Sequence, residues 1–261
     1  MMVTDGRGKP IRLPRPPRRI VSLVPSTTET LFALGLGDAV VGITRFCVHP
    51  AERLGGLTKV GGTKDLVLER LVALQPDLVI GNVEENTAEM FAAVEANAPL
   101  YAAFPRTVDE AIADLRAMGE LVGAAAAAQQ WAERIETTRA ELHAAARPGK
   151  RVAYLIWRKP WMVAGGDTFI SAMLAEAGCS NAFADRPGRY PTITLEALAE
   201  VDAVLLSSEP FPFKARHRAE LAAQSGVPED RIHFVDGEMM SWHGVRMAAA
   251  MAWLKEASGA W

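Results

Sequence analysis

Short apolar runs alternate with amphipathic segments through the first half of the chain. The runs are rich in β-branched residues and predict buried strands, whereas the segments with apolar positions every three or four residues predict helices. A capping box formed by Ser26 and Glu29 is expected to begin the first helix. The alternation predicts a parallel sheet covered by helices. The strands are expected at 19–24, 40–43, 77–81 and 100–104, and the helices at 26–34, 66–74, 83–96 and 108–122.

The alternation of strands and helices stops at the alanine run 124–128, and good helix formers follow it as far as Ala146. A helix of this length would extend roughly 35 Å at about 1.5 Å per residue. It suits a rigid rod that joins two lobes, and an ordinary amphipathic packing helix is the alternative. After Lys150 the alternation restarts. Strands are expected at 151–157, 201–207 and 232–235, and helices at 168–177, 195–199, 215–224 and 245–257.

A faint repeat links the two halves. The tetrapeptide LERL at 68–71 precedes DLVI at 77–80, and LEAL at 195–198 precedes DAVL at 202–205. Both halves therefore follow one plan. The predicted fold class is α/β, with two Rossmann-like lobes that have parallel sheets, are joined by one long rigid α-helix and enclose a ligand cleft between them. The expected boundaries are an N-terminal lobe at 1–123, a linking backbone helix at 124–148 and a C-terminal lobe at 149–261.

Composition narrows the class of protein. The chain has 261 residues, 49% of them hydrophobic, and a formal net charge of −3. It can therefore build a core, and disorder is excluded as its main state. The near-neutral charge argues against nucleic acid or an anionic membrane as a partner. Cys47 and Cys179 are too few for a disulfide scaffold or a four-cysteine zinc site. No apolar stretch approaches the roughly 20 residues that span a bilayer.

The first 19 residues are basic and rich in proline, and the apolar run of a secretory signal does not precede the first strand. We expect them to form a solvated arm. If Met1 is the true start, a cytoplasmic location is expected.

Candidate chemistry gathers where predicted strands end. Walker, nucleophile-elbow and HExxH motifs are absent from the sequence, so no enzyme is predicted. Ligands of open α/β sheets bind beyond the carboxyl ends of the strands, and aromatic side chains there suit a large, flat or partly apolar ligand. The alternatives are interlobe core for the aromatic residues and a solvated rim for the arginines. The predicted cleft residues are Arg45, Phe46, Glu84, Glu85, Phe104, Trp157, Trp161, Tyr190, Phe211, Trp242 and Arg246.

Cys47, His49 and His243 also follow predicted strands, and they are the residue types that bind copper or zinc. A hydrogen-bonded structural cysteine and a rim histidine are the simpler alternative. Glu84 and Glu85 are suited to a cationic ligand or metal, and the alternative is the acidic first turn of a helix.

Three segments carry a resemblance to a known family: 19–29 (RIVSLVPSTTE), 41–43 (VGI) and 68–80 (LERLVALQPDLVI). Together they resemble the class III substrate-binding proteins of ABC importers, the helical-backbone receptors for cobalamin, haem and iron–siderophores. The resemblance implies a monomeric, non-enzymatic protein that holds a corrinoid, a haem or a siderophore-type metal chelate. Phe46 and Tyr190 match aromatic residues that flank the corrin ring in cobalamin-binding members, and Trp157 matches a third loosely. Two tryptophans of those members fall on Thr63 and Asn82 here.

The resemblance also implies a partner and a compartment. Glu69 and Glu196 match the glutamates through which such receptors dock onto an ABC permease, and ordinary exposed helix carboxylates are the alternative. An importer receptor is periplasmic or lies on the cell surface. The alternative function is a cytoplasmic metal-binding receptor or enzyme-like protein derived from this family.

Overall fold

The computed structural model describes residues 1–145 and 149–261, which divide into two compact units. Unit 1 contains Met1–Pro105, Asp109–Arg134 and His243–Arg246, and unit 2 contains Arg106–Val108, Ile135–Trp242 and Met247–Trp261. The boundaries predicted from the sequence stay a prediction, and the expected end of the linking helix at 148 lies outside the described residues.

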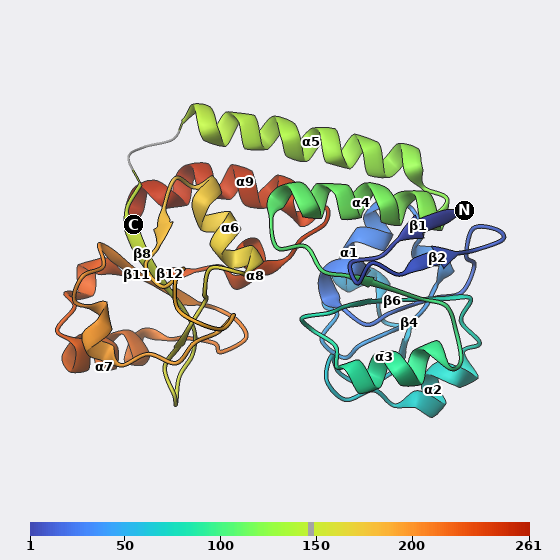
Figure 1. Cartoon of the computed structure of the whole chain (residues 1–261), viewed down its shortest axis with the longest axis horizontal. Coiled ribbons are helices and arrows are strands. Elements are labelled where there is room, and N and C mark those ends of the chain that lie inside the picture. Colours follow the sequence, from blue (N-terminus) through green and yellow to red (C-terminus); the bar gives the residue numbers. More distant parts are fainter. Residues whose placement is uncertain (146–148) are drawn as a thin grey trace. The chain divides into compact units, whose positions relative to one another are not determined.

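Unit 1 is built on a five-stranded sheet in which all pairs are parallel. Its helices cover both faces, with α2 and α3 on one side and α1 and α4 on the other (Figure 1). The apolar residues of the sheet and of α2 and α3 form one buried cluster. The strand order is β5 (Thr58–Lys59), β4 (Val40–Ile43), β3 (Ile20–Ser22), β6 (Leu78–Asn82), β7 (Leu100–Ala103). The helices are α1 (Pro25–Ala33), α2 (Leu68–Ala73), α3 (Ala88–Glu95) and α4 (Val108–Val122), with short 3-10 turns at Gly37–Ala39 and Ala51–Arg53.

Unit 2 has a sheet with the order β10 (Ser180–Asn181), β8 (Arg151–Trp157), β11 (Ala203–Ser207), β12 (Ile232–Val235). These strands are parallel, and β9 (Met162–Val163) adds an antiparallel edge to β8. The short β9 and β10 were missed in the sequence. The helices are α6 (Phe169–Glu176), α7 (Ala215–Ser225), α8 (Gly237–Ser241) and α9 (Arg246–Ala257), with 3-10 turns at Leu195–Leu198, Glu229–Arg231 and Ser258–Ala260.

The two sheets share one topology. In each, the next parallel strand along the chain (β4 after β3, β10 after β8) lies on one side of the first, and the last two strands (β6 and β7, β11 and β12) lie on the other side. The LERL and LEAL segments precede β6 and β11, which occupy equivalent positions in the two sheets. The predicted α/β fold with two lobes and parallel sheets is confirmed, and the repeat seen in the sequence corresponds to a repeat in topology.

The long helix α5 spans Ala125–Ala144, and the chain passes from unit 1 to unit 2 within it. At about 1.5 Å per residue it is roughly 30 Å long. Close packing of α4 on its first turns requires Gly119, because a Cβ there would lie 2.2 Å from the Cβ of Ala128. No helix in the described part of the chain is long and apolar enough to cross a membrane.

The predicted solvated arm is wrong for its first half. Residues Met2–Thr4 (β1) and Pro10–Arg12 (β2) pair as an antiparallel hairpin. The Asp5 carboxylate holds the hairpin by accepting hydrogen bonds from the backbone of Arg7 and Lys9, from the Arg7 guanidinium and from the backbone N–H of Ala102. Asp5 thus ties the hairpin together and joins it to β7, through contacts that composition alone does not reveal.

Two predicted helix starts are also wrong. Pro25 occupies the first turn of α1, Val24 is the N-cap, and Ser26 lies inside the helix without a capping bond. Proline favours the first helical position because it has no N–H to satisfy and its φ is preset, so the helix starts before the expected box. The helix expected from Val83 begins only at Ala88, after a turn that is described below.

Candidate functional site

The strand order creates one switch point in each sheet, where the chain changes direction across the sheet. It lies between β3 and β6 in unit 1 and between β8 and β11 in unit 2. Ligands of open parallel sheets bind beside the carboxyl ends of the strands at this point. We therefore describe the loops that follow these strands, one unit at a time.

In unit 1, two asparagines shape the turn after β6. Asn86 is buried, its Oδ1 accepts from the backbone N–H of Asn82, and its Nδ2 donates to the carbonyls of Thr63 (2.9 Å) and Leu23 (3.4 Å). Asn82 Oδ1 accepts from the backbone N–H groups of Glu84 (2.7 Å) and Glu85 (3.2 Å). Such local side-chain bonds compete with helix formation, which explains why α3 starts late.

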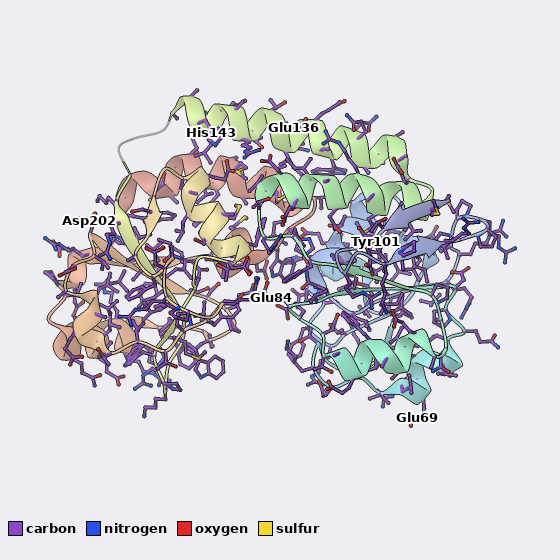
Figure 2. The ribbon with its side chains drawn as sticks, viewed as in Figure 1. Glu69, Glu84, Tyr101, Glu136, His143 and Asp202 are labelled. Atoms are coloured by element: carbon purple, nitrogen blue, oxygen red, sulfur yellow. The ribbon has the colours of Figure 1, made fainter. Side chains whose placement is uncertain are left out.

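Glu84 and Glu85 therefore lie in this turn and not in a first helical turn, so the helix alternative for them is wrong (Figure 2 labels Glu84). Lys64 Nζ donates to the Glu84 carbonyl at 2.7 Å. Desolvation of the Glu85 carboxyl raises its pKa, and the nearby charge of Lys64 opposes that rise. Glu85 as a whole residue is still exposed to solvent. The turn presents two carboxylates beside β6.

The segment His243–Arg246 packs on both sides of this switch point. His243 Nε2 lies 3.0 Å from Asn82 Nδ2, at the end of β6. Arg246 makes two bonds to the Glu29 carboxylate, at 2.8 and 2.9 Å, and its side chain is only 10% exposed. Thr30, which follows Glu29 in α1, accepts at its Oγ1 from the backbone N–H of Val245. Arg246 is therefore engaged by α1.

The loop after β4 carries the most exposed aromatic residue of the chain's described part. Phe46 is 50% exposed, and the guanidinium carbon of Arg45 lies 4.8 Å from the centre of its ring. Arg45 in turn makes two bonds to Asp65, at 2.8 and 3.0 Å. Phe46 thus presents an apolar face at a strand end while being held by a charged neighbour.

Cys47 and the two histidines do not form a metal centre together. Cys47 is buried, and its Sγ lies 3.1 Å from Thr28 Oγ1 and 3.2 Å from Thr44 Oγ1. His243 is engaged by Asn82, as described above. Among the described residues, no group of three or more His, Cys, Asp and Glu side chains is arranged to hold a metal. The contacts of Cys47 are those of a structural cysteine.

Unit 2 presents an aromatic cluster after β8 and β11. Trp157 is 40% exposed and meets Phe211 edge-on, with 5.6 Å between ring centres. Phe211 contacts Phe213 (4.8 Å) and His217 (5.1 Å), and Trp161 stacks on Phe213 at 6.2 Å. The predicted residues Trp157, Trp161 and Phe211 are therefore brought together.

Glu209 organises the switch point of unit 2. Its Oε1 accepts from Trp242 Nε1 at 2.8 Å and from Ser241 Oγ at 2.9 Å. Ser207 Oγ, which is buried at the end of β11, donates to the Glu209 carbonyl and lies 2.9 Å from the Tyr154 hydroxyl. Trp242 is 8% exposed, so its ring is mostly core and its indole N–H is used internally.

The remaining predicted residues lie in other loops of the two units. Phe104 follows β7 and is half-buried. Gly6 packs closely against its backbone, since a Cβ at Gly6 would lie 2.4 Å from the Phe104 nitrogen. Tyr190 is half-buried in the loop before Pro191, whose carbonyl bonds to β9. His49 lies beside the turn Ala51–Arg53 and is half-buried.

A periplasmic binding protein family model matches residues 20–214. The chain belongs to this family. The apo form of the periplasmic heme-binding protein RhuT from Roseiflexus sp. RS-1 is 28% identical, with a TM-score of 0.80 over 92% of this chain and 97% of that one. The ABC transporter substrate-binding lipoprotein YvrC of Bacillus subtilis is 26% identical over 97% of this chain and 84% of its own length. The vitamin B12-binding protein of Vibrio parahaemolyticus is 28% identical over 69% of this chain and 66% of its own length. The match therefore spans just under two thirds of that relative.

The resemblance to importer receptors is thereby confirmed. The fold is further supported by the vitamin B12-binding protein BtuF of Vibrio cholerae, with a TM-score of 0.77 at 22% identity. The matched family members are binding proteins, which agrees with the absence of enzyme motifs from the sequence.

Two glutamates occupy equivalent places in this periplasmic binding protein. Glu69 lies in the first turn of α2, ahead of β6, and points away from the body of unit 1 (Figure 2). Glu196 lies in the 3-10 turn ahead of β11 and is exposed. Its pKa is lowered by hydrogen bonds from its own backbone N–H and from Thr194. Both residues are therefore exposed on topologically matched turns.

Sequence reasoning missed several residues that build the strand-end loops: Asn82, Asn86, Asp65 and Glu209. The spacing of Asn82 and Asn86 was a usable signal, because an asparagine after a strand commonly closes a turn. The glycine pair Gly61–Gly62 was a second usable signal of a turn. The contact between Asn82 and His243 joins residues 161 positions apart, and no local pattern indicates it.

Proposed function

We propose that this periplasmic binding protein is the substrate-binding component of an ABC importer and that its ligand is a corrinoid, a haem or a ferric chelate. One observation carries the ligand class: large aromatic side chains are exposed at strand ends in both units, Phe46 by 50% and Trp157 by 40%. Exposed aromatic faces beside the ligand end of a sheet suit a large, flat and partly apolar molecule.

The relatives support this class. RhuT is a heme-binding protein, the Vibrio parahaemolyticus protein binds vitamin B12, and a further structural neighbour from Saccharomonospora viridis belongs to a ferric-hydroxamate transport system. The shared chemistry of these ligands is a metal ion wrapped in an organic chelator. We propose contacts to it from the strand-end residues predicted above, with Phe46 and Trp157 foremost. The interlobe cleft stays a prediction.

Titration of the purified chain with haemin, cyanocobalamin and a ferric hydroxamate, followed by absorbance and tryptophan fluorescence, tests the proposal. We expect one of the three to bind in the micromolar range or tighter. Replacing Phe46 by alanine should weaken it about three- to tenfold, the usual size of an aromatic contact. Phe234→Ala is the matched control, because Phe234 is 45% exposed but lies on strand β12. If none of the three binds above background, the ligand class is wrong and only family membership remains.

We further propose that Glu69 and Glu196 contact the permease. The support is their exposure on matched turns before β6 and β11. Each alanine variant should reduce stimulation of the reconstituted importer's ATPase activity and leave ligand binding unchanged. The exposed glutamates Glu52 and Glu200 provide control variants. Equal effects of all four substitutions would show that charge in general, and not these positions, matters.

Such a receptor works outside the cytoplasmic membrane, and we propose a periplasmic or lipid-anchored location. The name of YvrC as a lipoprotein supports this. A globomycin-sensitive or signal-peptidase-dependent size change in the native host would test it, and exclusive recovery in the cytosol would contradict it.

A further inference from the structure

We propose that Arg45 is a positioning residue for Phe46 and that Asp65 holds it in that role. This inference rests on the proposed function, because it takes Phe46 to be a ligand contact. It assigns Arg45 a different task from the one expected of a strand-end arginine, which is to pair with a carboxylate or phosphate of the ligand.

The first step of the argument is that the guanidinium is already occupied. Arg45 Nη1 donates to Asp65 Oδ2 at 2.8 Å, and Nη2 donates to Oδ1 at 3.0 Å. This two-bond fork fixes the plane of the guanidinium as well as its position. The hydrogen bonds with Arg45 are the main reason that the pKa of Asp65 is lowered, so the pair stays charged over the neutral range.

The second step is that the fixed guanidinium lies over a ring. The Arg45 Cζ atom is 4.8 Å from the centre of the Phe46 ring, within the range of a cation–π contact. Half of Phe46 is exposed, so one face of the ring is covered by Arg45 and much of the remainder faces solvent. An exposed phenylalanine without such a neighbour would sample several rotamers. The stack restricts the ring before a ligand arrives, which lowers the entropic cost of binding.

The third step is that the backbone is shaped to admit the ion pair. Gly62 lies where a Cβ would be 2.2 Å from Asp65 Oδ1 and 2.9 Å from Arg45 Nη2. Gly61 has a φ of +119°, and a Cβ there would be 2.2 Å from the Asp65 carbonyl oxygen. Hydrogen bonds from Arg45 N to Gly61 O (2.8 Å) and from Gly62 N to Asp65 O (3.1 Å) close the turn. The glycine pair Gly61–Gly62 thus makes room for the Arg45–Asp65 contact.

Both members of the ion pair are about half exposed, at 51% and 61% of their side chains. Ion pairs of this kind contribute little to global stability. The expected consequence of breaking the pair is therefore a change in where the ring lies and not the loss of the fold.

A measurement without ligand tests the positioning directly. In the full chain, the side-chain protons of Arg45 should show a ring-current shift from Phe46, and Phe46→Leu gives the reference without the ring. Asp65→Asn should move the Arg45 resonances most of the way to that reference. Arg53 lies 4.8 Å above Phe32 and serves as an internal control whose shift should not change. Retention of the full Arg45 shift in the Asp65→Asn variant would overturn the proposal.

A binding cycle tests the consequence for the ligand. Haemin, cyanocobalamin and a ferric hydroxamate are titrated into the parent chain, Asp65→Asn, Phe46→Leu and the double variant. We expect Asp65→Asn to weaken the bound probe about three- to tenfold in the parent and less than about twofold in the Phe46→Leu background, because residues acting through one another are not additive. Asp38→Asn is the matched control: it breaks the Arg53–Asp38 pair, which lies on another loop, and should leave affinity unchanged.

The outcomes separate the two proposals. Equal losses from Asp65→Asn in both backgrounds would show that Asp65 or Arg45 meets the ligand directly, and the positioning role would be wrong. If none of the three probes binds the parent chain, the ligand class proposed above fails, and the ring-current measurement still decides whether Asp65 positions the Arg45–Phe46 stack.

Discussion

The two units share a strand order but fill their switch points with different chemistry. Unit 1 uses a polar network, in which the turn after β6 is built by Asn82 and Asn86 and is covered by His243. Unit 2 uses a cluster of rings after β8 and β11 and a single carboxylate, Glu209, that anchors the indole of Trp242. The fold therefore dictates where the strand-end loops lie, and the side chains in them decide what each unit presents.

This difference affects how the stability of each unit responds to the loss of a side chain. A buried polar network is stable only while every member has a partner, because an unpaired buried donor or acceptor keeps its full desolvation cost. Ring clusters are more tolerant, since partial loss of an apolar contact leaves no unsatisfied group. We expect unit 1 to respond more strongly than unit 2 to the loss of one strand-end side chain.

The largest effect is expected at Asn86. Alanine at this position removes the acceptor of the Asn82 N–H and the donor to two carbonyls, in a site where the side chain is buried. The free energy of unfolding of unit 1 should fall by about 3 kcal/mol, the cost of two or more buried groups left unpaired. Urea unfolding followed by circular dichroism measures it. Asn97→Ala, whose amide bonds one carbonyl on the surface, is the control and should cost less than about 1 kcal/mol.

A smaller loss is expected at Glu209. Alanine leaves Trp242 Nε1 without its acceptor, whereas Ser241 Oγ can still donate to the Gly237 carbonyl at 2.8 Å, and we expect about 2 kcal/mol of destabilisation. Glutamine retains an acceptor oxygen and should restore at least half of that. The environment of Trp242 provides a local readout, because its fluorescence should shift to longer wavelength in Glu209→Ala only. A loss as large as that of Asn86→Ala would remove the proposed contrast between the units.

Much of this architecture could be predicted from the sequence, and the failures have identifiable causes. The strands β3, β4, β6 and β8 are short continuous apolar runs, and their length and β-branched residues identify them. The hairpin of β1 and β2 was missed because its stability comes from Asp5, which bonds to residues near and far along the chain. The apparent capping box failed because Pro25 starts the helix earlier and Glu29 binds Arg246, 217 positions away.

The candidate site could likewise be predicted only in part from the sequence. Its location at strand ends and several of its aromatic residues could be inferred, because they follow apolar runs directly. The partners of those residues could not, because pairs such as Arg45 with Asp65, Glu209 with Trp242 and Asn82 with His243 are made in three dimensions.

The smallest effect concerns pH and the cover of unit 1's switch point. Desolvation lowers the pKa of His243 to about 4, and Asn82 Nδ2 can only donate, so Nε2 of a neutral ring accepts from it. The ordinary pKa of histidine is about 6.5, so between pH 6.5 and 4 the unfolded chain binds more protons than the folded one, and stability falls as the pH falls. Above pH 6.5 this contribution is fully present.

Because His243 is half-buried, we expect about 1 kcal/mol to be lost by pH 5, less than the full shift would give. The stability difference between the parent and His243→Gln, measured by urea unfolding at several pH values, should therefore shrink or reverse as the pH drops from 7 to 5. His143→Gln, whose ring lies against Glu176 in unit 2, controls for histidine loss in general. A pH-independent difference for His243→Gln would mean that the ring and the amide do not meet as described, and the polar character assigned to the switch point of unit 1 would rest on its asparagines alone.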